Sequence, residues 1–401
     1  MGCKPNFDSP INSPSKKIKF TKHQTQTQEL IPHLPQEIIE EILSRLPVKS
    51  LLKFSCVSKS WLSLISTPNF IETHLQNSSH HRILLTIDDP YTDSPDYLQN
   101  CSLHSLLYNP VTDAMNIPWD WDEFSVVVGS CNGLVCIAKR FDKLFLWNPS
   151  TRKSRRLPFS VVEMFFNDDI YEFGYFTYGF GFDESTNDYK IVKYFCYEHL
   201  TLVMIYSFKT DSWKHIEDFP GRPIKNTAKF VNGKFYWIAS HLLRINIVSL
   251  DIETQRFEEI ELPQLSEPDN YKHLTLGVSG ECLSMLINYE KYGDLWILKE
   301  RAWSKVVNIP FIVDDTKIFE QSWNKLFTIP FDISYPGIFE EWTPLYMLNN
   351  GEILLLFGTI FIVYNPKDKG LRCPIINNFT PCLKANIYVE SLVSPMDMGH
   401  T

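Results

Sequence analysis

A short phrase recurs along most of this chain. A strand-forming stretch ends in an aromatic or aliphatic residue, a polar turn with Thr or Asp follows, and a second short stretch often closes on Ile-Pro or Leu-Pro. The six copies begin at Tyr108, Trp147, Tyr206, Leu250, Trp296 and Tyr364. Successive starts differ by 39, 59, 44, 46 and 68 residues. A period of roughly 40–50 residues is typical of propeller blades, so the phrase predicts an all-β propeller with six blades and two longer units.

Other phrases predict the remaining strands of each blade. Asn132-Gly133 and Asn232-Gly233 lie between strand-like stretches and supply the positive backbone angles of tight hairpin turns, and Asn350-Gly351 repeats the pattern. In the recurring phrase, Asn148 and Asp251 are expected to accept backbone hydrogen bonds within the turn. A β-sandwich is the alternative architecture. We favour the propeller because a sandwich does not require one phrase to occur six times.

The N-terminal region has a different pattern, which predicts three short helices. From Pro35 to Leu46 the apolar residues fall at helical spacing in a stripe two residues wide. Pro47 ends this helix. A second helix is expected from Val48 to about Cys56, and a third after an N-cap at Ser58, stopped by Pro68.

These helices hold too little apolar surface to fold alone. Ordering some 37 residues costs on the order of 1.5 kcal/mol per residue, and burial of the fifteen large apolar side chains between 32 and 68, at roughly 1.5–3 kcal/mol each, does not offset that cost. We therefore expect the helices to dock on another surface. The alternative is that this surface is the rest of the same chain. Against it stands a polar stretch from Gln76 to His81, predicted to separate helices from strands.

Composition excludes several classes of partner. The formal net charge is -9 and no long basic stripe occurs, so neither nucleic acid nor an anionic membrane is expected to bind. The basic cluster Lys16, Lys17 and Lys19 lies within a polar tail, residues 1–29, that is predicted to be disordered. The longest apolar run, Ile353 to Tyr364, is shorter than the roughly 20 residues of a membrane span. No secretory signal opens the chain, and a cytoplasmic or nuclear location is expected.

No motif indicates a metal, a cofactor or catalysis. The nine cysteines are scattered without a C-x-x-C pair, as expected of reduced thiols. Phosphate-binding loops and H-E-x-x-H are absent, and Cys131 stands where a nucleophile elbow has Ser. Paired carboxylates that meet only in space leave open a propeller hydrolase or oxidase as the enzymatic alternative.

At the N-terminal helices the chain resembles an F-box, the helical motif that docks on the Skp-type adaptor of cullin-RING ubiquitin ligases. The resemblance runs in order through Leu34-Pro35, Glu37-Ile38, Ile42-Leu43, Leu46-Pro47-Val48, Leu51-Leu52, Val57-Ser58-Lys59 and Trp61.

Downstream, the chain is similar to the F-box-associated, kelch-like domain of the large plant F-box family, which includes the S-locus F-box proteins. The matching phrases are GSCNGLVC from Gly129, WNPSTRK from Trp147, YGFGFDESTNDYKIV from Tyr178, SWNKLFTIP from Ser322, NGEILLL from Asn350 and VESLVSP from Val389. The paired glycines of true kelch blades are missing. The resemblance covers residues 30–396 and implies a tail at 1–29, an F-box at 30–75, a linker at 76–82 and a propeller at 83–396.

The resemblance implies a non-enzymatic substrate receptor of an SCF-type ubiquitin ligase, without cofactor, which binds the Skp-type adaptor and through it the cullin and RING subunits. A stand-alone scaffold that binds the adaptor without ubiquitin transfer is the other alternative. The residues expected to face the adaptor, or to brace that face, are Leu34, Pro35, Ile38, Leu46, Pro47, Val48, Leu51, Leu52 and Trp61. Ile39 and Leu43, on the neighbouring stripe, are predicted to be internal.

The propeller would capture a target protein on loops of one face, where insertions gather. The two long units supply the candidate loops, Glu163 to Tyr178 and Phe311 to Pro344. In the first, the candidate contacts are Phe165, Phe166, Tyr171 and Phe176, because aromatic side chains are frequent binding hot spots. The alternative is that these rings only cover a blade.

Overall fold

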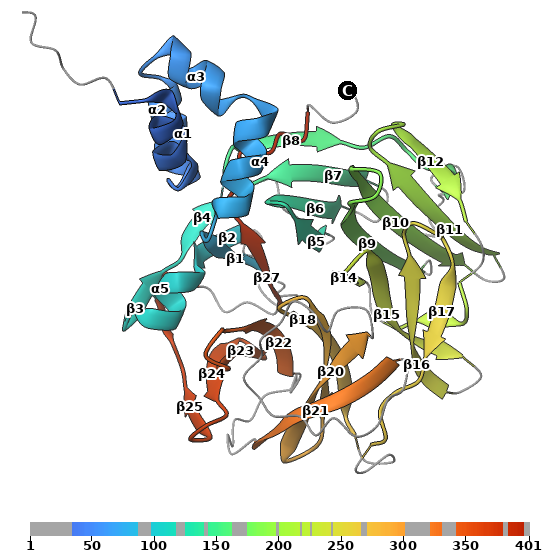
Figure 1. The fold of residues 1–401 in the computed structure, drawn as a ribbon. Helices are drawn as coiled ribbons and strands as arrows, with labels where there is room; N and C mark the ends of the chain where they lie inside the picture. The colour runs from blue at the N-terminus through green and yellow to red at the C-terminus, as the bar shows by residue number, and fades with distance from the viewer. Residues whose placement is uncertain are drawn as a thin grey trace, which may run out of the picture.

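The structure is a computed structural model in which a group of short helices adjoins a ring of antiparallel sheets (Figure 1). The described residues are 34–86, 98–117, 125–139, 143–162, 175–197, 200–216, 219–224, 227–241, 244–265, 271–300, 321–330, 342–379 and 384–396.

The ring is a six-bladed propeller, as the repeat predicted. The first blade is β27 (Lys384–Val389), β1 (His81–Thr86), β2 (Leu98–Ser102) and β4 (Met115–Ile117). The second is β5 (Ser125–Cys131), β6 (Leu134–Lys139), β7 (Lys143–Asn148) and β8 (Lys153–Arg156). The third is β9 (Tyr175–Asp183), β10 (Asp188–Tyr197), β11 (Leu200–Ser207) and β12 (Ser212–His215).

The fourth blade has an extra strand: β13 (Arg222–Pro223) and β14 (Lys229–Val231) both pair with β15 (Lys234–His241), followed by β16 (Arg244–Asp251) and β17 (Phe257–Ile260). The fifth is β18 (His273–Ser279), β19 (Cys282–Asn288), β20 (Tyr292–Glu300) and β21 (Gln321–Pro330). The sixth is β22 (Trp342–Met347), β23 (Ile353–Phe357), β24 (Ile360–Asn365) and β25 (Gly370–Arg372). A parallel pair, β3 (Val111–Asp113) and β26 (Ile375–Asn377), lies outside the blades.

The C-terminal strand closes the ring. β27 pairs antiparallel with β1, with Lys384 opposite Thr86 and Val389 opposite His81. The first blade therefore combines strands from both ends of the domain. This pairing joins the two ends of the domain in one sheet, and each blade keeps only short edges at its inner and outer strands.

Four of the six recurring phrases form the predicted turn between two strands, those beginning at Trp147, Tyr206, Leu250 and Tyr364. Asn148 Oδ1 accepts the Ser150 backbone N–H at 2.8 Å, and Asp251 Oδ1 accepts that of Thr254 at 2.8 Å, as predicted.

The other two phrases differ. The prediction at Tyr108 was wrong, because this residue ends helix α5 (Leu103–Tyr108), which the Ser102 side chain caps. For the phrase at Trp296, residues 301–310 lie outside the described residues, and β20 pairs with β19 on one side and β21 on the other.

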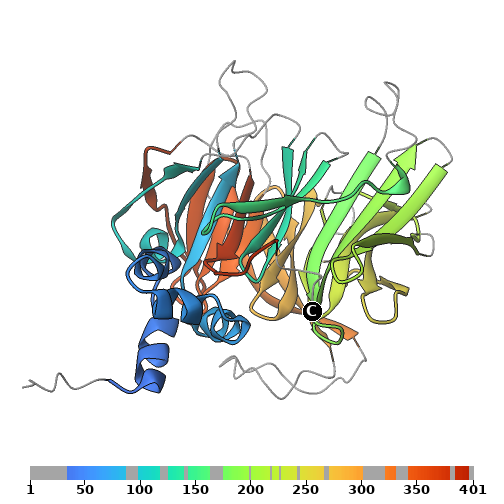
Figure 2. The same ribbon diagram turned by 90° about the horizontal axis from the view of Figure 1, so that it is seen from above.

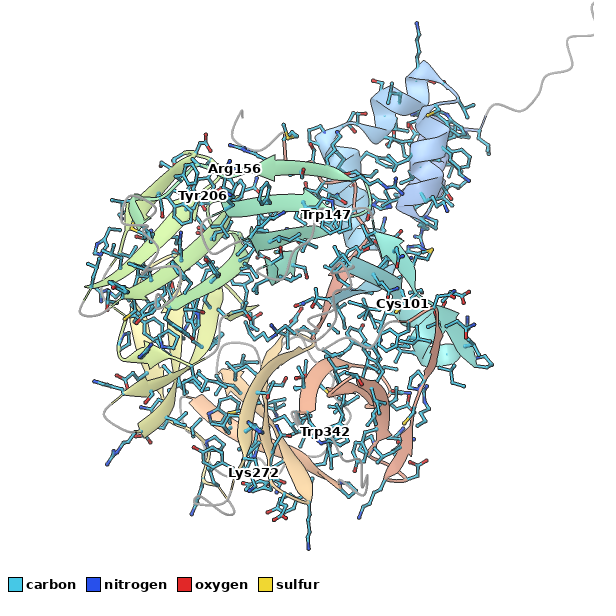
Figure 3. All side chains as sticks on the ribbon, turned by 180° about the vertical axis from the view of Figure 1, so that it is seen from behind. Cys101, Trp147, Arg156, Tyr206, Lys272 and Trp342 are labelled. Carbon is cyan, nitrogen blue, oxygen red and sulfur yellow. The ribbon has the colours of Figure 1, made fainter. Side chains whose placement is uncertain are left out.

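Large aromatic side chains fill the space between blades. Trp147 of the second blade and Trp342 of the sixth are buried within the propeller (Figure 3). The third and fourth blades share a cluster that contains Tyr194, Phe219 and Trp237. Sheets arranged around an axis diverge outward, and wide planar rings fill that gap with little loss of rotamer freedom.

The seven cysteines among the described residues are unpaired thiols. Cys101 and Cys136 are buried, and burial raises the pKa of Cys101 to about 11. No helix in the described part of the chain is long and apolar enough to cross a membrane.

Four helices, rather than the predicted three, precede the propeller. They are α1 (Gln36–Ser44), α2 (Val48–Ser55), α3 (Lys59–Ile65) and α4 (Pro68–Asn77). The predicted stop at Pro68 was wrong: Pro68 occupies the first turn of α4, where its missing N–H costs nothing, and Thr67 caps that helix. The stretch 76–82 comprises the end of α4, three residues and the start of β1.

Candidate functional site

The four helices share a small core of their own. Leu43, Val48, Leu51, Ile65 and Phe70 are buried together, and Ile39, Leu46, Phe54, Trp61, Leu64 and Ile71 pack against them. One member comes from the far end of the chain: Leu392, three residues after β27, lies in the same cluster and is 8% exposed. The propeller thus completes part of the helical core.

Both Leu-Pro pairs determine where helices begin. Pro35 and Pro47 directly precede α1 and α2 with extended backbone angles, ψ 145° and 144°. Their carbonyls accept the first helical hydrogen bonds, from Ile39 N at 3.2 Å and Leu51 N at 3.2 Å. Each proline therefore fixes the residue at which its helix begins.

A second set of apolar side chains, on the first three helices and beside them, is exposed to solvent. Six of the fifteen large apolar residues that are exposed in the described part of the chain fall between positions 34 and 62. They are Leu34, Ile38, Ile42, Leu52, Val57 and Leu62. We call these six the exposed helical set. Such a concentration within so short a segment makes these residues a candidate docking surface.

Part of the set lies on α1. Ile38 and Ile42 are 46% and 49% exposed and are four residues apart, which places them on one helix face, and Leu34, 57% exposed, lies just before the helix. Leu43 on the other side of the helix is buried, and Ile39 packs against the core, as predicted for both. The two-residue-wide stripe therefore divides into an inner and an outer half.

The structure sorts the nine adaptor-facing candidates. Leu34, Pro35, Ile38 and Leu52 are exposed, whereas Leu46, Pro47 and Trp61 are half-buried. Val48 and Leu51 are 1% and 0% exposed, so they brace the surface from inside and do not contribute atoms to it. Trp61 packs edge-on against Phe54, with ring centroids 5.4 Å apart.

Three exposed residues were not among the candidates: Ile42, Val57 and Leu62. Ile42 was detectable, because it continues the four-residue interval from Leu34 and Ile38. Val57 lies between α2 and α3, where helical periodicity gives no information about its direction.

Of the proposed target-contacting aromatics, Phe165, Phe166 and Tyr171 lie outside the described residues, as does most of the second candidate loop. Phe176 does not lie on a loop: it is the second residue of β9 and is 4% exposed. Its ring packs on Phe195, with centroids 5.0 Å apart, and contributes to the core between the second and third blades. Its prediction as a contact residue was therefore wrong.

The helices are tied to the propeller through its C-terminal segment. Glu390 N donates to the carbonyl of His80 at 2.9 Å, and Ser78 Oγ donates to the carbonyl of Glu390 at 3.2 Å. The Glu390 carboxylate also accepts from Arg82 of β1 at 3.4 Å. The polar stretch after α4, expected to separate the two parts, is thus held against the segment that carries Leu392. Figure 2 shows the helices at one edge of the propeller.

Comparison with known proteins agrees with this architecture. Residues 31–73 match the F-box domain, and residues 102–394 match the F-box associated beta propeller domain. The F-box/kelch-repeat protein At3g23880 of Arabidopsis thaliana is 32% identical over 398 residues, which cover 94% of this chain and 100% of the relative.

Two further Arabidopsis thaliana proteins are similar. The F-box protein At5g10340 is 28% identical, over 94% of this chain and 87% of its own length. The F-box protein CPR1 is 29% identical, over 69% of this chain and 73% of its own length. This chain therefore belongs to the F-box proteins that carry an F-box associated β-propeller domain.

Proposed function

We propose that this protein is the substrate-recognition subunit of an SCF-type cullin-RING ubiquitin ligase. In this proposal the N-terminal helices bind a Skp-type adaptor, and through it the cullin and RING subunits. The propeller binds a target protein for ubiquitination and proteasomal degradation. The chain itself supplies no covalent chemistry; it raises the concentration of the target near the conjugating enzyme.

The exposed helical set carries the proposal. A helical unit that has its own core and still exposes Ile38 and Ile42 on α1, with Leu34 just before it, has an apolar face that another polypeptide can cover. Burial of each such side chain in an interface is worth about 1.5–3 kcal/mol. Membership of the F-box family supports a Skp-type adaptor as the partner.

Adaptor binding by the purified full-length chain tests the proposal. The double variant Ile38→Ala/Ile42→Ala removes two exposed anchors and keeps good helix formers, so we expect normal folding and adaptor affinity weakened by about 30-fold or more. Ile375→Ala, which truncates a propeller side chain that is 59% exposed, is the matched control and should bind normally. Unchanged affinity of the double variant would overturn the proposed surface.

Cullin recruitment separates the receptor from a stand-alone scaffold. A receptor brings cullin into the complex as soon as adaptor is present, and a scaffold binds adaptor alone. The enzymatic alternative predicts that the chain without residues 1–75 retains turnover of a substrate.

A further inference from the structure

The outer strand of the second blade has an open edge. β8 lies at the outside of its sheet, and among the described strands it pairs only with β7 (Figure 1). Leu157 N donates to the Leu144 carbonyl at 2.9 Å in this antiparallel ladder. Hydrogen-bonded pairs alternate with unbonded pairs, so the backbone groups of Ser154 and Arg156 point away from β7. Both residues are exposed, and their N–H and C=O groups can pair with a further strand.

Uncompensated positive charge flanks this edge. Arg152, Lys153 and Arg156 are exposed, and in the described part of the chain no ion pair joins any of them to a carboxylate. Figure 3 shows Arg156 at the outer margin of the propeller. Arg155, which lies between them, is compensated, because its guanidinium is 2.6 Å from the Asp211 carboxylate. This local excess of cations contrasts with the chain as a whole, whose net charge is -9.

Cations on two other outer strands have acidic partners. Lys325 of β21 lies 2.7 Å from the carboxylate of Asp294. Arg372 of β25 lies 3.8 Å from that of Glu352. The unpaired charge of β8 is therefore a local property of the second blade and not a general feature of the outer strands.

Exposed apolar side chains follow directly after the strand. Phe159 and Val161 are 57% and 40% exposed. The Arg156 guanidinium lies over the Phe159 ring, 4.6 Å from its centroid, and Trp213 Nε1 donates to the Pro158 carbonyl at 2.9 Å. Cations on an edge strand can simply prevent aggregation, but an exposed aromatic ring beside them opposes that role. The combination favours a docking surface.

We propose that this edge of the second blade binds an acidic, extended segment of another protein, which adds as a strand beside β8. Side chains of an added strand alternate between two faces, as do Lys153 and Arg156, so carboxylates on both faces can find a cation. An apolar side chain of the segment can pack on Phe159. The inference does not rest on the proposed adaptor contact, because none of these residues belongs to the exposed helical set. Under the proposed function, the segment belongs to the target protein.

Selection of random peptides of about twelve residues on the immobilised full-length chain tests the site. We expect peptides rich in Asp and Glu. In fluorescence polarisation, Lys153→Gln/Arg156→Gln should weaken their binding by about tenfold or more and remove most of its salt dependence. Lys367→Gln/Lys369→Gln removes the same charge from exposed positions in the equivalent turn of the sixth blade, and this control should bind normally. Absence of acidic enrichment, or equal binding by both double variants, would overturn the site.

Ser154→Pro tests the addition of a strand. Because the Ser154 N–H points away from β7, proline removes an edge donor and leaves the ladder intact. We expect an unchanged Tm and at least about tenfold weaker peptide binding. Methylation of alternate backbone nitrogens in the selected peptide tests the same bonds without a change in the protein, and should also weaken binding. Binding that neither change affects would contradict strand addition.

Two other occupants of the edge give different results. Binding of a single-stranded oligonucleotide that Lys153→Gln/Arg156→Gln loses, without enrichment of acidic peptides, would assign the edge to nucleic acid and overturn the proposal. Peptide binding seen only in Asp168→Asn/Asp169→Asn would assign the edge to an acidic stretch of this chain that lies outside the described residues, and would also overturn it.

The same variants keep this proposal separate from the proposed function. Ile38→Ala/Ile42→Ala should retain acidic-peptide binding, and Lys153→Gln/Arg156→Gln should retain adaptor binding. Loss of peptide binding in the first variant would contradict the assignment to β8, whereas failure of adaptor binding alone would leave that assignment standing.

Discussion

Asn148 and Val393 are joined by a hydrogen bond of 2.7 Å from the side-chain amide to the backbone carbonyl. The same amide donates to the Ser391 carbonyl at 3.0 Å, while its Oδ1 accepts backbone N–H groups within the turn after β7. One buried side chain thus shapes a turn of the second blade and holds the C-terminal segment that closes the ring. Between these two bonds lies Leu392, whose side chain enters the helical core.

Asn148→Ala should strongly destabilise the propeller, because it leaves backbone carbonyls of the C-terminal segment without their donor in a buried site. Each unsatisfied buried group costs about 1–3 kcal/mol, so we expect a loss of at least about 2 kcal/mol in urea unfolding. Asn365 occupies the same place in the phrase at the end of β24, but among the described residues its side chain bonds within its own turn, to Lys367 and Asp368. Asn365→Ala is the control, with an expected loss below about 1 kcal/mol; equal losses would contradict this role of Asn148.

Gly133→Ala and Gly233→Ala form a second matched pair. Both glycines end an Asn-Gly hairpin with positive φ, 79° and 76°. A Cβ at Gly133 would collide with the Ser391 side chain and lie 2.7 Å from the Val389 carbonyl, whereas a Cβ at Gly233 meets nothing within 4 Å. Both variants introduce a backbone strain of about 1 kcal/mol. Only Gly133→Ala also displaces the C-terminal segment that closes the ring. Thermal unfolding should show a clearly larger decrease in Tm for Gly133→Ala.

Leu51→Ala and Leu52→Ala should separate stability from binding. Leu51 is fully buried and Leu52 is 38% exposed. Truncation of Leu51 leaves a cavity and should lower the free energy of unfolding of the helices by about 2–5 kcal/mol. Hydrogen exchange of the amides in α1–α4 measures this loss. Leu52→Ala should change exchange little and weaken adaptor binding. The reverse pattern would show that the inner and outer faces of α2 are assigned wrongly.

Lowering the pH should decrease the stability of the helical unit through protonation of His74. This side chain is 1% exposed, its Nε2 is 2.9 Å from the Leu46 carbonyl, and its Nδ1 has no partner among the described residues. Burial lowers the pKa of His74 below its usual 6.5. The unfolded state therefore takes up the proton first, and stability is lost as the pH falls below about 6.5, by at most about 1.4 kcal/mol per pH unit.

Hydrogen exchange of α1–α4 measured from pH 7.5 to pH 5.5, corrected for the intrinsic pH dependence of exchange, gives this stability change. His74→Gln can keep a donor to the Leu46 carbonyl and cannot titrate. Its helices should lose this part of the pH dependence, and an unchanged pH profile would exclude His74 as the cause.

The blades could be predicted from the sequence because their determinants are local. Alternating apolar residues, Asn-Gly pairs and the Asn148 type of turn act within about ten residues, and the phrase repeats. The two wrong predictions, at Pro68 and at Tyr108, have the same origin. Pro68 is compatible with either the end or the start of a helix, and Tyr108 follows a short apolar stretch that either a strand or a helix can form.

By itself the sequence determined the helical periodicity of residues 35–65, the period of the blades and the family to which the chain belongs. Only the tertiary structure decided which half of the two-residue stripe is covered, with Leu43 inside and Ile42 outside, and that Leu392 completes the helical core. The physical reason is that secondary structure follows from contacts between near neighbours, whereas burial depends on chain segments hundreds of residues apart.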